Sequence, residues 1–260
     1  MSQYAEKQRL GKSLFTPLPE HLDSILDIGC GTGVWALAVA AERPSTQVIA
    51  TDLTLPKTLP PSNVKFLQSD AEQPWPFDQK FGFIHCRMLF SGIHDWPSFL
   101  ARCREHLAPG GWIELHGPYQ PYRADNPAAN KAEASSLIKW GYACQESWER
   151  SGIDCHTVNH QMDRLRAAGF ENIEERRVTW PIGEWGDTER ERQIGAITLE
   201  NLSGFIGLVG VQLMANHSTL TLAQKEELVS GVQKDLSENI HENRYYVALS
   251  VFTAQKPLDN

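Results

Sequence analysis

Leu26-Asp27-Ile28-Gly29-Cys30-Gly31-Thr32-Gly33 is the stretch that decides the fold. It lies between a predicted strand, 24–28, and a predicted helix, 33–42. Glycines at such a turn let a ligand approach the backbone where any Cβ would clash. The first N–H groups of the helix can then bind a carboxylate or a phosphate. The glycines follow a G-x-G-x-G pattern, whereas a dinucleotide fingerprint needs glycine at position 34, which is Val34. The spacing therefore disfavours a nicotinamide or flavin enzyme without excluding one.

Acidic residues accompany the first three predicted strands. Asp52 ends the second strand, nineteen residues beyond Gly33, where a carboxylate can accept two hydrogen bonds from the ribose of an adenosyl cofactor. Asp70 follows the third strand and can accept from an adenine amino group, and Asp27 can receive a cofactor ammonium directly or through water. Each of them alone could be a turn former or a helix cap. The ordered set is far more specific and indicates an adenosyl-cofactor site.

Short apolar runs alternate with helical patterns through the first half of the chain, which predicts β-α-β units and a parallel sheet. Pro97 can begin a helix that runs to His106, and Pro109-Gly110-Gly111 ends it. The expected strands of this half are 24–28, 47–51, 64–68, 81–86 and 112–115. In the second half we expect helices at 126–149 and 159–168, strands at 173–181 and 245–254, and a long, mostly helical segment at 183–243.

The motifs resemble those of class I S-adenosylmethionine (SAM)-dependent methyltransferases, and among them the LaeA-like family of fungal secondary metabolism. The glycine loop matches the first motif. The other matching stretches are Ile49-Ala50-Thr51-Asp52-Leu53, Asp70-Ala71-Glu72-Gln73-Pro74-Trp75, Phe83-Ile84-His85-Cys86-Arg87-Met88-Leu89, Asp95-Trp96-Pro97, Leu107-Ala108-Pro109-Gly110-Gly111-Trp112-Ile113-Glu114 and Trp180-Pro181-Ile182-Gly183-Glu184-Trp185. The resemblance covers nearly the whole chain and is weakest at 118–160. It implies a Rossmann-like α/β fold, a seven-stranded sheet whose last strand is antiparallel, and SAM as the cofactor.

The segment 183–243 interrupts what would otherwise be a tight hairpin between the last two strands. Inserts of this length are usually lids or binding elements. We therefore expect a SAM-binding core at 1–182, a helical cap at 183–243 and a final core strand within 244–260. The cap should pack over the carboxyl edge of the sheet, with part of 204–214 facing the methyl acceptor. The expected cofactor-binding residues are Asp27, Gly29, Cys30, Gly31, Gly33, Asp52, Leu53, Asp70, Ala71, Cys86 and Arg87.

Ligands of open α/β sheets bind beyond the carboxyl ends of the strands, which places His85, Arg87, His94, His116 and Tyr119 within reach of the acceptor. SAM supplies the electrophile, so a base is needed only for a hydroxyl or a protonated amine. His116 is the first candidate for this base and His94 the second, although either could simply shape the pocket. Many relatives carry a polar amide at position 116, so this histidine departs from the family. The histidines show no H-x-x-x-H or carboxylate-paired spacing, and we expect no metal.

The overall composition limits the classes of binding partner and the compartments that we expect. The net charge of −8 disfavours binding to phosphate backbones, so we expect a small-molecule acceptor and no nucleic acid. The five cysteines are odd in number and include no C-x-x-C pair, which argues against a disulfide framework or a zinc knuckle. The N-terminus lacks the apolar core of a signal peptide, and the most apolar stretch is too short and too polar to span a membrane. These features favour the cytoplasm, with the nucleus as the alternative.

Three interpretations of the function stay open. The first is a methyltransferase that modifies O or N of a small natural-product intermediate. The second is a LaeA-like regulatory protein with an unknown methyl acceptor or none. The third is a SAM-using enzyme without methyl transfer, such as a cyclase. All three bind SAM, so the motifs do not separate them, and the sequence leaves the acceptor and the oligomeric state undetermined.

Overall fold

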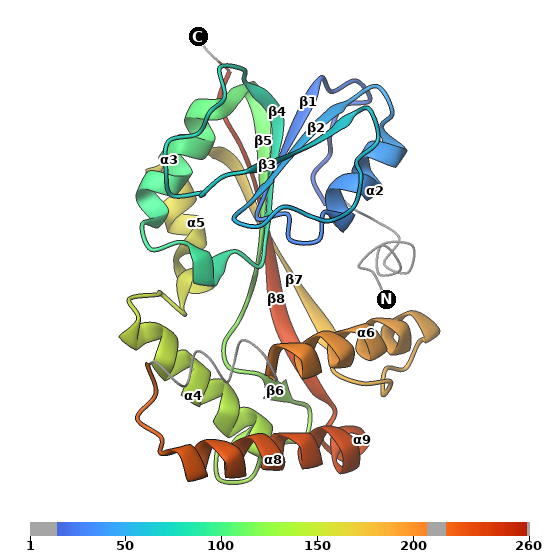
Figure 1. Ribbon diagram of the computed structural model, residues 1–260, viewed down its shortest axis with the longest axis vertical. Helices are drawn as coiled ribbons and strands as arrows, with labels where there is room; N and C mark the ends of the chain where they lie inside the picture. Colours follow the sequence, from blue (N-terminus) through green and yellow to red (C-terminus); the bar gives the residue numbers. More distant parts are fainter. Residues whose placement is uncertain (1–14, 207–216, 259–260) are drawn as a thin grey trace. The chain divides into compact units, whose positions relative to one another are not determined.

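The computed structural model of the 260-residue chain describes residues 15–206 and 217–258. Its elements alternate between strand and helix in the first half, as predicted (Figure 1). In chain order they are β1 Ser24–Ile28, α2 Val34–Glu42, β2 Gln47–Asp52, β3 Val64–Gln68, β4 Phe81–Arg87, η1 Phe90–Gly92, α3 Trp96–His106, β5 Leu107–Pro118, β6 Arg123–Ala124, η2 Pro127–Asn130, α4 Ser136–Arg150, α5 Thr157–Ala167, β7 Glu171–Pro181, α6 Glu189–Phe205, α8 Leu222–Glu238, α9 Ile240–Asn243 and β8 Tyr245–Gln255.

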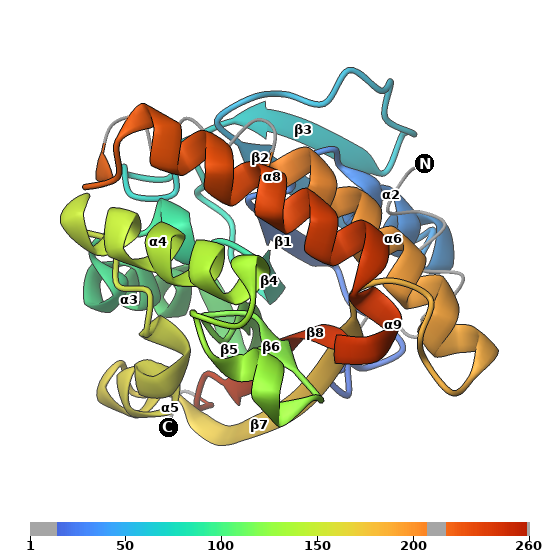
Figure 2. The same ribbon diagram turned by 90° about the horizontal axis from the view of Figure 1, so that it is seen from below.

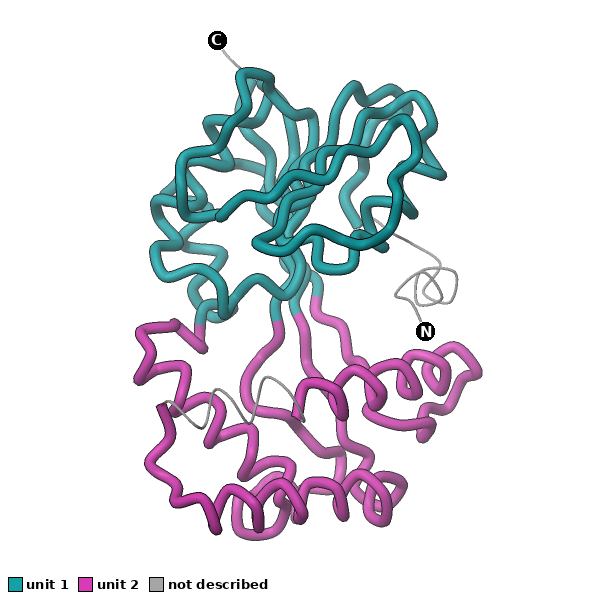
Figure 3. Tube along the Cα trace, viewed as in Figure 1, with its two compact units in different colours: residues 1–117, 157–176, 250–260 teal, residues 118–156, 177–249 magenta. Residues whose placement is uncertain are grey.

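The chain forms two compact units, coloured separately in Figure 3. The first contains residues 1–117, 157–176 and 250–260, and the second contains 118–156 and 177–249. The predicted cap at 183–243 thus falls within the second unit, which also includes 118–156, a stretch that the sequence analysis assigned to the core. The core–cap boundary at residue 182 and the placement of the cap over the sheet stay predictions. The part of the expected acceptor-facing stretch at 207–214 lies outside the described residues.

The strands form one sheet in the order β3-β2-β1-β4-β5-β8-β6, with β7 paired to β8. The first five strands pair in parallel, as the β-α-β pattern predicts. Backbone hydrogen bonds link Gly111 to Lys256 near one end of β5 and Tyr119 to Ala248 near the other, so β8 runs antiparallel to β5. The Rossmann-like α/β prediction is confirmed.

Within residues 15–206 and 217–258 the sheet has eight strands and not seven. The additional strand is β6, which pairs antiparallel with the beginning of β8. A strand of two residues is too short to show a period-two pattern, so the sequence does not predict β6. This strand forms because β8 lies beside it. The other difference is β5, which begins at Leu107 and not at 112. Gly110 has φ +74°, and the register with β4 shifts between Phe81 and Phe83. An irregularity of this kind lets Pro109-Gly110-Gly111 end a helix and still lie inside a strand.

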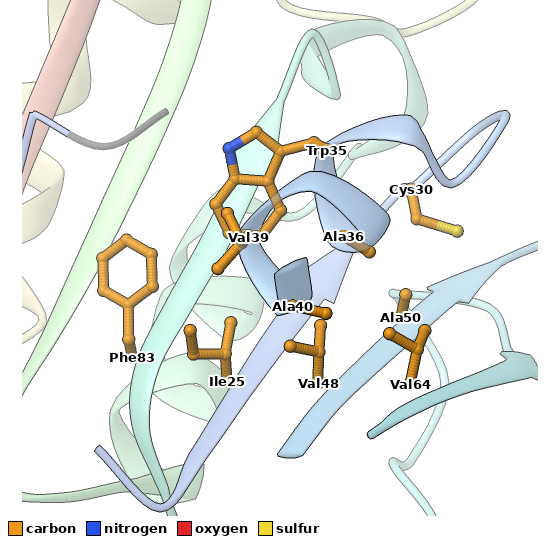
Figure 4. Close-up of a cluster of buried hydrophobic side chains, with 10 residues drawn as sticks. All are labelled: Ile25, Cys30, Trp35, Ala36, Val39, Ala40, Val48, Ala50, Val64 and Phe83. Atoms are coloured by element: carbon orange, nitrogen blue, oxygen red, sulfur yellow. The ribbon is translucent and has the colours of Figure 1, made fainter. Parts of the chain in front are cut away.

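The core of the first unit depends on strands that are buried on both faces. Every residue of β1 is buried, as expected where helices cover both sides of a parallel sheet. Helix α2 lies on one face, and α3 and α5 lie on the other (Figure 1). Trp35, Val39 and Ala40 of α2 pack over Ile25 and Phe83 of the strands (Figure 4). This α2 face also carries the glycine loop.

The second unit is mainly helical, as predicted for 183–243, and α4 packs against α8 (Figure 2). The expected helix 126–149 is two elements, the short η2 and α4, because the Ser135 hydroxyl caps a new helix by accepting from the Ile138 N–H. Buried Asp235 of α8 accepts hydrogen bonds from the Ser135 hydroxyl and the Leu137 N–H, which ties the two helices together. No helix within the described ranges is long and apolar enough to cross a membrane.

Candidate active site

The glycine loop has the backbone that its sequence requires. Gly29, Gly31 and Gly33 have φ values of +71°, +54° and +77°, a region that other residues adopt only with strain. The N–H groups of Gly29 and Cys30 both donate to the Thr51 carbonyl over 2.9 Å, which holds the loop against the end of β2. A Cβ at Gly29 or Gly33 would meet a packed side chain within 2.8 Å, whereas a Cβ at Gly31 would meet nothing within 4 Å. Gly31 therefore faces open space, which suits the approach of a cofactor.

Asp52 lies at the edge of this loop. Its Oδ2 accepts from the Gly31 N–H over 2.8 Å, and its Oδ1 accepts from the Thr54 N–H over 3.1 Å. Each carboxylate oxygen has a second lone pair for a ligand hydroxyl. The neighbouring Leu53 side chain is 65% exposed, although it is apolar. Exposed apolar surface beside a half-buried carboxylate is the arrangement that a ribose and a flat base would cover.

Asp70 and Ala71 lie in the turn after β3. Asp70 is exposed, and its Oδ1 accepts from the Glu72 N–H over 2.9 Å, so it does serve as a turn former. The Ala71 carbonyl accepts from the Trp75 indole over 3.1 Å and from Arg102 over 2.7 Å. These bonds fix the turn, and within the described residues the second carboxylate oxygen of Asp70 takes no part in it.

A row of buried polar residues crosses the α2 face of the sheet. Asp27 of β1 pairs in register with His85 of β4, and His85 pairs with Glu114 of β5. His116 lies two residues beyond Glu114 and so on the same face. The His85 Nδ1 is 2.8 Å from Asp27 Oδ1, and the His116 Nε2 is 2.7 Å from Glu114 Oε1. The Trp35 ring stacks on His85 at 3.7 Å between centroids. The sheet thus brings four titratable groups together beside the glycine loop.

Burial dominates the titration of the Asp27–His85 pair. It raises the pKa of Asp27 to about 7, an effect that the Arg87 charge partly opposes. Burial also lowers the pKa of His85 well below its ordinary value, and the neighbouring His116 adds to this shift. Both changes favour the neutral form of each group. The Asp27 Oδ2 and the His85 Nε2 are buried and have no hydrogen-bond partner in the described chain.

Sequence reasoning missed His85 as a partner of Asp27, and it gave no role in the site to Glu114 or Trp35. The available signal was a polar residue in the middle of each apolar strand, at positions that parallel pairing aligns. The same pairing assembles a group that the spacing argument against a metal did not consider: the ligand atoms of His85, Glu114 and His116 all lie within 4.8 Å of one another.

The other residues that the sequence predicted for the site lie outside the buried polar row. Cys30 and Cys86 are buried thiols near the loop, and burial raises the pKa of Cys30 to about 12, so both stay protonated and act through packing. The Arg87 side chain is half-buried at the end of β4. The His94 side chain is 58% exposed, and its Nδ1 contacts Glu72 Oε2 at 2.8 Å. His94 therefore pairs with a different carboxylate from His116.

A pocket opens near the carboxyl ends of β4 and β5. Its lining includes Leu89, Phe90, Leu115 and Phe252, so it is mainly apolar, and it also includes His116. The end of the buried polar row therefore reaches this pocket.

Residues 3–175 match the methyltransferase domain family, and this chain belongs to that family. Among fungal relatives it is 29% identical to the methyltransferase pytC of Aspergillus terreus, over 93% of this chain and 74% of pytC. It is also 29% identical to the protein-methionine methyltransferase laeA of Emericella nidulans, over 96% of this chain and 67% of laeA. The fold matches phosphoethanolamine N-methyltransferase 2 of Haemonchus contortus in complex with SAM, with a TM-score of 0.55 and 19% identity, over 96% of this chain and 52% of that one.

These findings confirm the class that the motifs predicted. The chain is a SAM-dependent methyltransferase of the Rossmann-like class, related to fungal proteins of secondary metabolism. Its glycine loop fits the cofactor, because the loop is open at Gly31 and the buried Asp27 Oδ2 beside it has no partner.

Proposed function

We propose that this methyltransferase modifies an oxygen or nitrogen of a small, largely apolar natural-product intermediate. The observation that carries the proposal is the intact cofactor loop, in which the open Gly31 and the unpartnered Asp27 Oδ2 lie at the end of β1. Support for a small acceptor comes from the net charge of −8, which disfavours a nucleic-acid acceptor, and from the mainly apolar pocket that His116 lines together with Leu115 and Phe252.

The cofactor supplies an electrophilic methyl group on a sulfonium. Asp27 would receive its ammonium, Asp52 its ribose hydroxyls and Asp70 its adenine amino group. Gly29, Cys30, Gly31 and Gly33 would provide the backbone surface, with Leu53 and Ala71 against the base and Cys86 and Arg87 beside the methionine part. Rigid alignment of the acceptor with the methyl group contributes roughly 7–11 kcal/mol to lowering of the barrier in well-oriented systems.

His116 is the proposed general base. Its side chain is 9% exposed and is held by Glu114, so its orientation is fixed, as catalysis requires. His94 is the second candidate, but its 58% exposure and its contact with Glu72 give it less restraint. We assign no metal to the reaction, since methyl transfer from a sulfonium needs none.

The test uses SAM that carries a tritiated methyl group, mixed with the full chain and a fungal metabolite extract. Label in the organic-soluble fraction, together with release of S-adenosylhomocysteine, supports the proposal. A matched reaction with the Asp52→Ala variant controls for transfer by other enzymes in the extract. If the protein binds SAM tightly but labels no extract fraction, the chain does not methylate a small molecule from that source.

A protein acceptor is the second candidate, because the relative laeA is named a protein-methionine methyltransferase. The same experiment separates the two, since a protein acceptor leaves the label in acid-precipitated protein. For either acceptor we propose the cytoplasm or the nucleus as the compartment, because all five cysteines are free and buried, as in reducing environments. The acidic surface makes nucleic acid an improbable partner.

A further inference from the structure

Glu114 is a fully buried carboxylate whose two oxygens are both hydrogen-bonded. Oε2 accepts from the Phe15 N–H over 2.9 Å, the Thr16 N–H over 2.8 Å and the Thr16 hydroxyl over 2.6 Å. Oε1 is 2.7 Å from the His116 Nε2. Burial alone would raise the pKa of Glu114, but the bonds from His116 and Thr16 outweigh it and lower the pKa to about 2. The side chain is therefore an anion around neutral pH.

An ionised carboxylate can only accept hydrogen bonds. The 2.7 Å contact consequently requires the proton of neutral His116 to be on Nε2, which leaves Nδ1 with a lone pair. Within residues 15–206 and 217–258, Nδ1 makes no hydrogen bond, and it is not among the fully buried atoms. The rings of Phe15 and His85 meet the imidazole edge-on, at centroid distances of 5.7 and 5.2 Å, and restrict its rotation.

We propose that Glu114 is a positioning residue that fixes the tautomer of His116, so that Nδ1 is the atom that removes the acceptor proton. The inference rests on the proposed function for its catalytic meaning. As the acceptor oxygen or nitrogen bonds to the methyl carbon, the carbon–sulfur bond breaks with its electron pair on sulfur. The acceptor proton moves to Nδ1, and solvent later takes it. Thr16 supports the arrangement from the N-terminal side by holding Oε2.

The charged groups around His116 show what the Glu114 carboxylate contributes at this position. Arg87 pairs with His116 in register on β4, and the Arg176 guanidinium lies 5.2 Å from the centre of the Phe15 ring, so two cations lie in these surroundings. The other facing groups, His85 and Asp27, are shifted towards their neutral forms. Glu114 is the group that balances these charges when His116 takes a proton.

A metal ion held by His85, Glu114 and His116 is the competing interpretation of the same cluster. The 2.7 Å distance between Oε1 and Nε2 fits a hydrogen bond directly. Two ligands of a zinc ion, each roughly 2.0–2.2 Å from the metal in tetrahedral geometry, lie farther apart than this. Three hydrogen-bond donors also already occupy Oε2. We therefore favour the hydrogen-bonded pair and keep the metal as an outcome of the test.

The decisive measurement is the tautomer of His116 in the full chain labelled with ¹⁵N-histidine, which needs no acceptor. Long-range ¹H–¹⁵N spectra distinguish Nε2–H from Nδ1–H, and the His116→Gln variant assigns the signal. We expect Nε2–H in the wild type. In Glu114→Gln the single amide oxygen should stay with the three donors at Phe15 and Thr16. The amide NH₂ then faces Nε2, and the proton should move to Nδ1.

Three further variants serve as controls. Thr16→Val removes one of the three donors to Oε2 but keeps the two backbone donors, so Glu114 stays ionised and both Thr16→Val and Thr16→Ser should keep Nε2–H. Glu149→Gln, the same change beside the exposed His156, should leave the His116 signal unchanged. The wild-type tautomer decides the question even if Glu114→Gln fails to fold.

The kinetic consequence follows with an acceptor found by the tritium experiment. Glu114→Gln should lower kcat by about 10²-fold or more with the Kd for SAM unchanged. Nδ1–H in the wild type, or Nε2–H in Glu114→Gln, overturns the inference. So do stoichiometric shifts of the His85 and His116 signals on addition of zinc chloride, which would make the cluster a metal site. If no acceptor is found, the tautomer result still stands, so failure of the proposed function and failure of this inference are distinguishable.

Discussion

Replacement of Asp27 by Asn should change how the free energy of unfolding depends on pH. The native pKa of Asp27 is raised from 3.8 to about 7, so between these values the native state carries a proton that the unfolded state has lost. Stability from this group is complete below pH 3.8 and is lost as the pH rises towards 7. The slope is about −1.4 kcal/mol per pH unit inside that window.

His85 acts in the opposite direction. Its native pKa is well below its ordinary 6.5, so in the interval beneath 6.5 the unfolded state carries the additional proton. Stability from His85 therefore increases with pH by up to about 1.4 kcal/mol per unit, until the pH passes 6.5. Where the two windows overlap, at pH values below 6.5 and above the lowered pKa of His85, the native pair and the unfolded pair bind the same number of protons. The two contributions then cancel in the wild type.

Each single variant should reveal the pH dependence of stability that the remaining group causes. Relative to the wild type, Asp27→Asn should gain a slope of about +1.4 kcal/mol per pH unit in the interval beneath pH 6.5, and His85→Gln a slope of about −1.4. Urea denaturation followed by tryptophan fluorescence at half-unit pH steps measures both, and other titrating groups cancel in the difference. Slopes equal to that of the wild type in both variants, or slopes of the reverse sign, would refute the assignment of a neutral buried pair.

Three further predictions concern the cofactor loop and the base. Asp52→Ala should weaken SAM binding by roughly 10–100-fold in calorimetry, because charge-assisted hydrogen bonds to the ribose contribute about 1.5–3 kcal/mol. The Gly31 and Thr54 N–H groups, which lose their acceptor in this variant, can bind water instead. An unchanged Kd for SAM in a folded variant contradicts the ribose role. Gly31→Ala and Gly152→Ala share a left-handed backbone with open space around the added Cβ, so both should lose about 1–2 kcal/mol of stability, but only Gly31→Ala should weaken SAM binding. Equal effects of the two on SAM affinity would show that the loop change acts through strain alone. His116→Ala should lower turnover by about 10²-fold or more at constant SAM affinity, and a larger loss in His94→Ala would transfer the base role to His94.

The sequence was most informative where the physics is local. The glycine loop could be predicted because each of Gly29, Gly31 and Gly33 has a positive φ, and the preference of glycine for this conformation does not depend on other residues. The strands β1 and β3 have the predicted bounds, since their apolar runs are bordered by turn residues on both sides. The break at 131–135 was missed because it depends on a cap formed by the Ser135 side chain, and a helical pattern continues across it.

The sequence by itself determined the class of fold, the cofactor loop and the family, because these follow from residues that are close together in the chain. Only the tertiary structure decided how Asp27, His85, Glu114 and His116 meet. Asp27 and His85 are 58 residues apart, and Thr16 and Glu114 are 98 apart. Parallel strand register sets these contacts, and register depends on the burial of whole strand faces, so no local pattern reports it. The tautomer that we infer for His116 has the same origin. It depends on the Glu114 carboxylate, and the fold brings the hydrogen-bond donors to that carboxylate from a distant part of the chain.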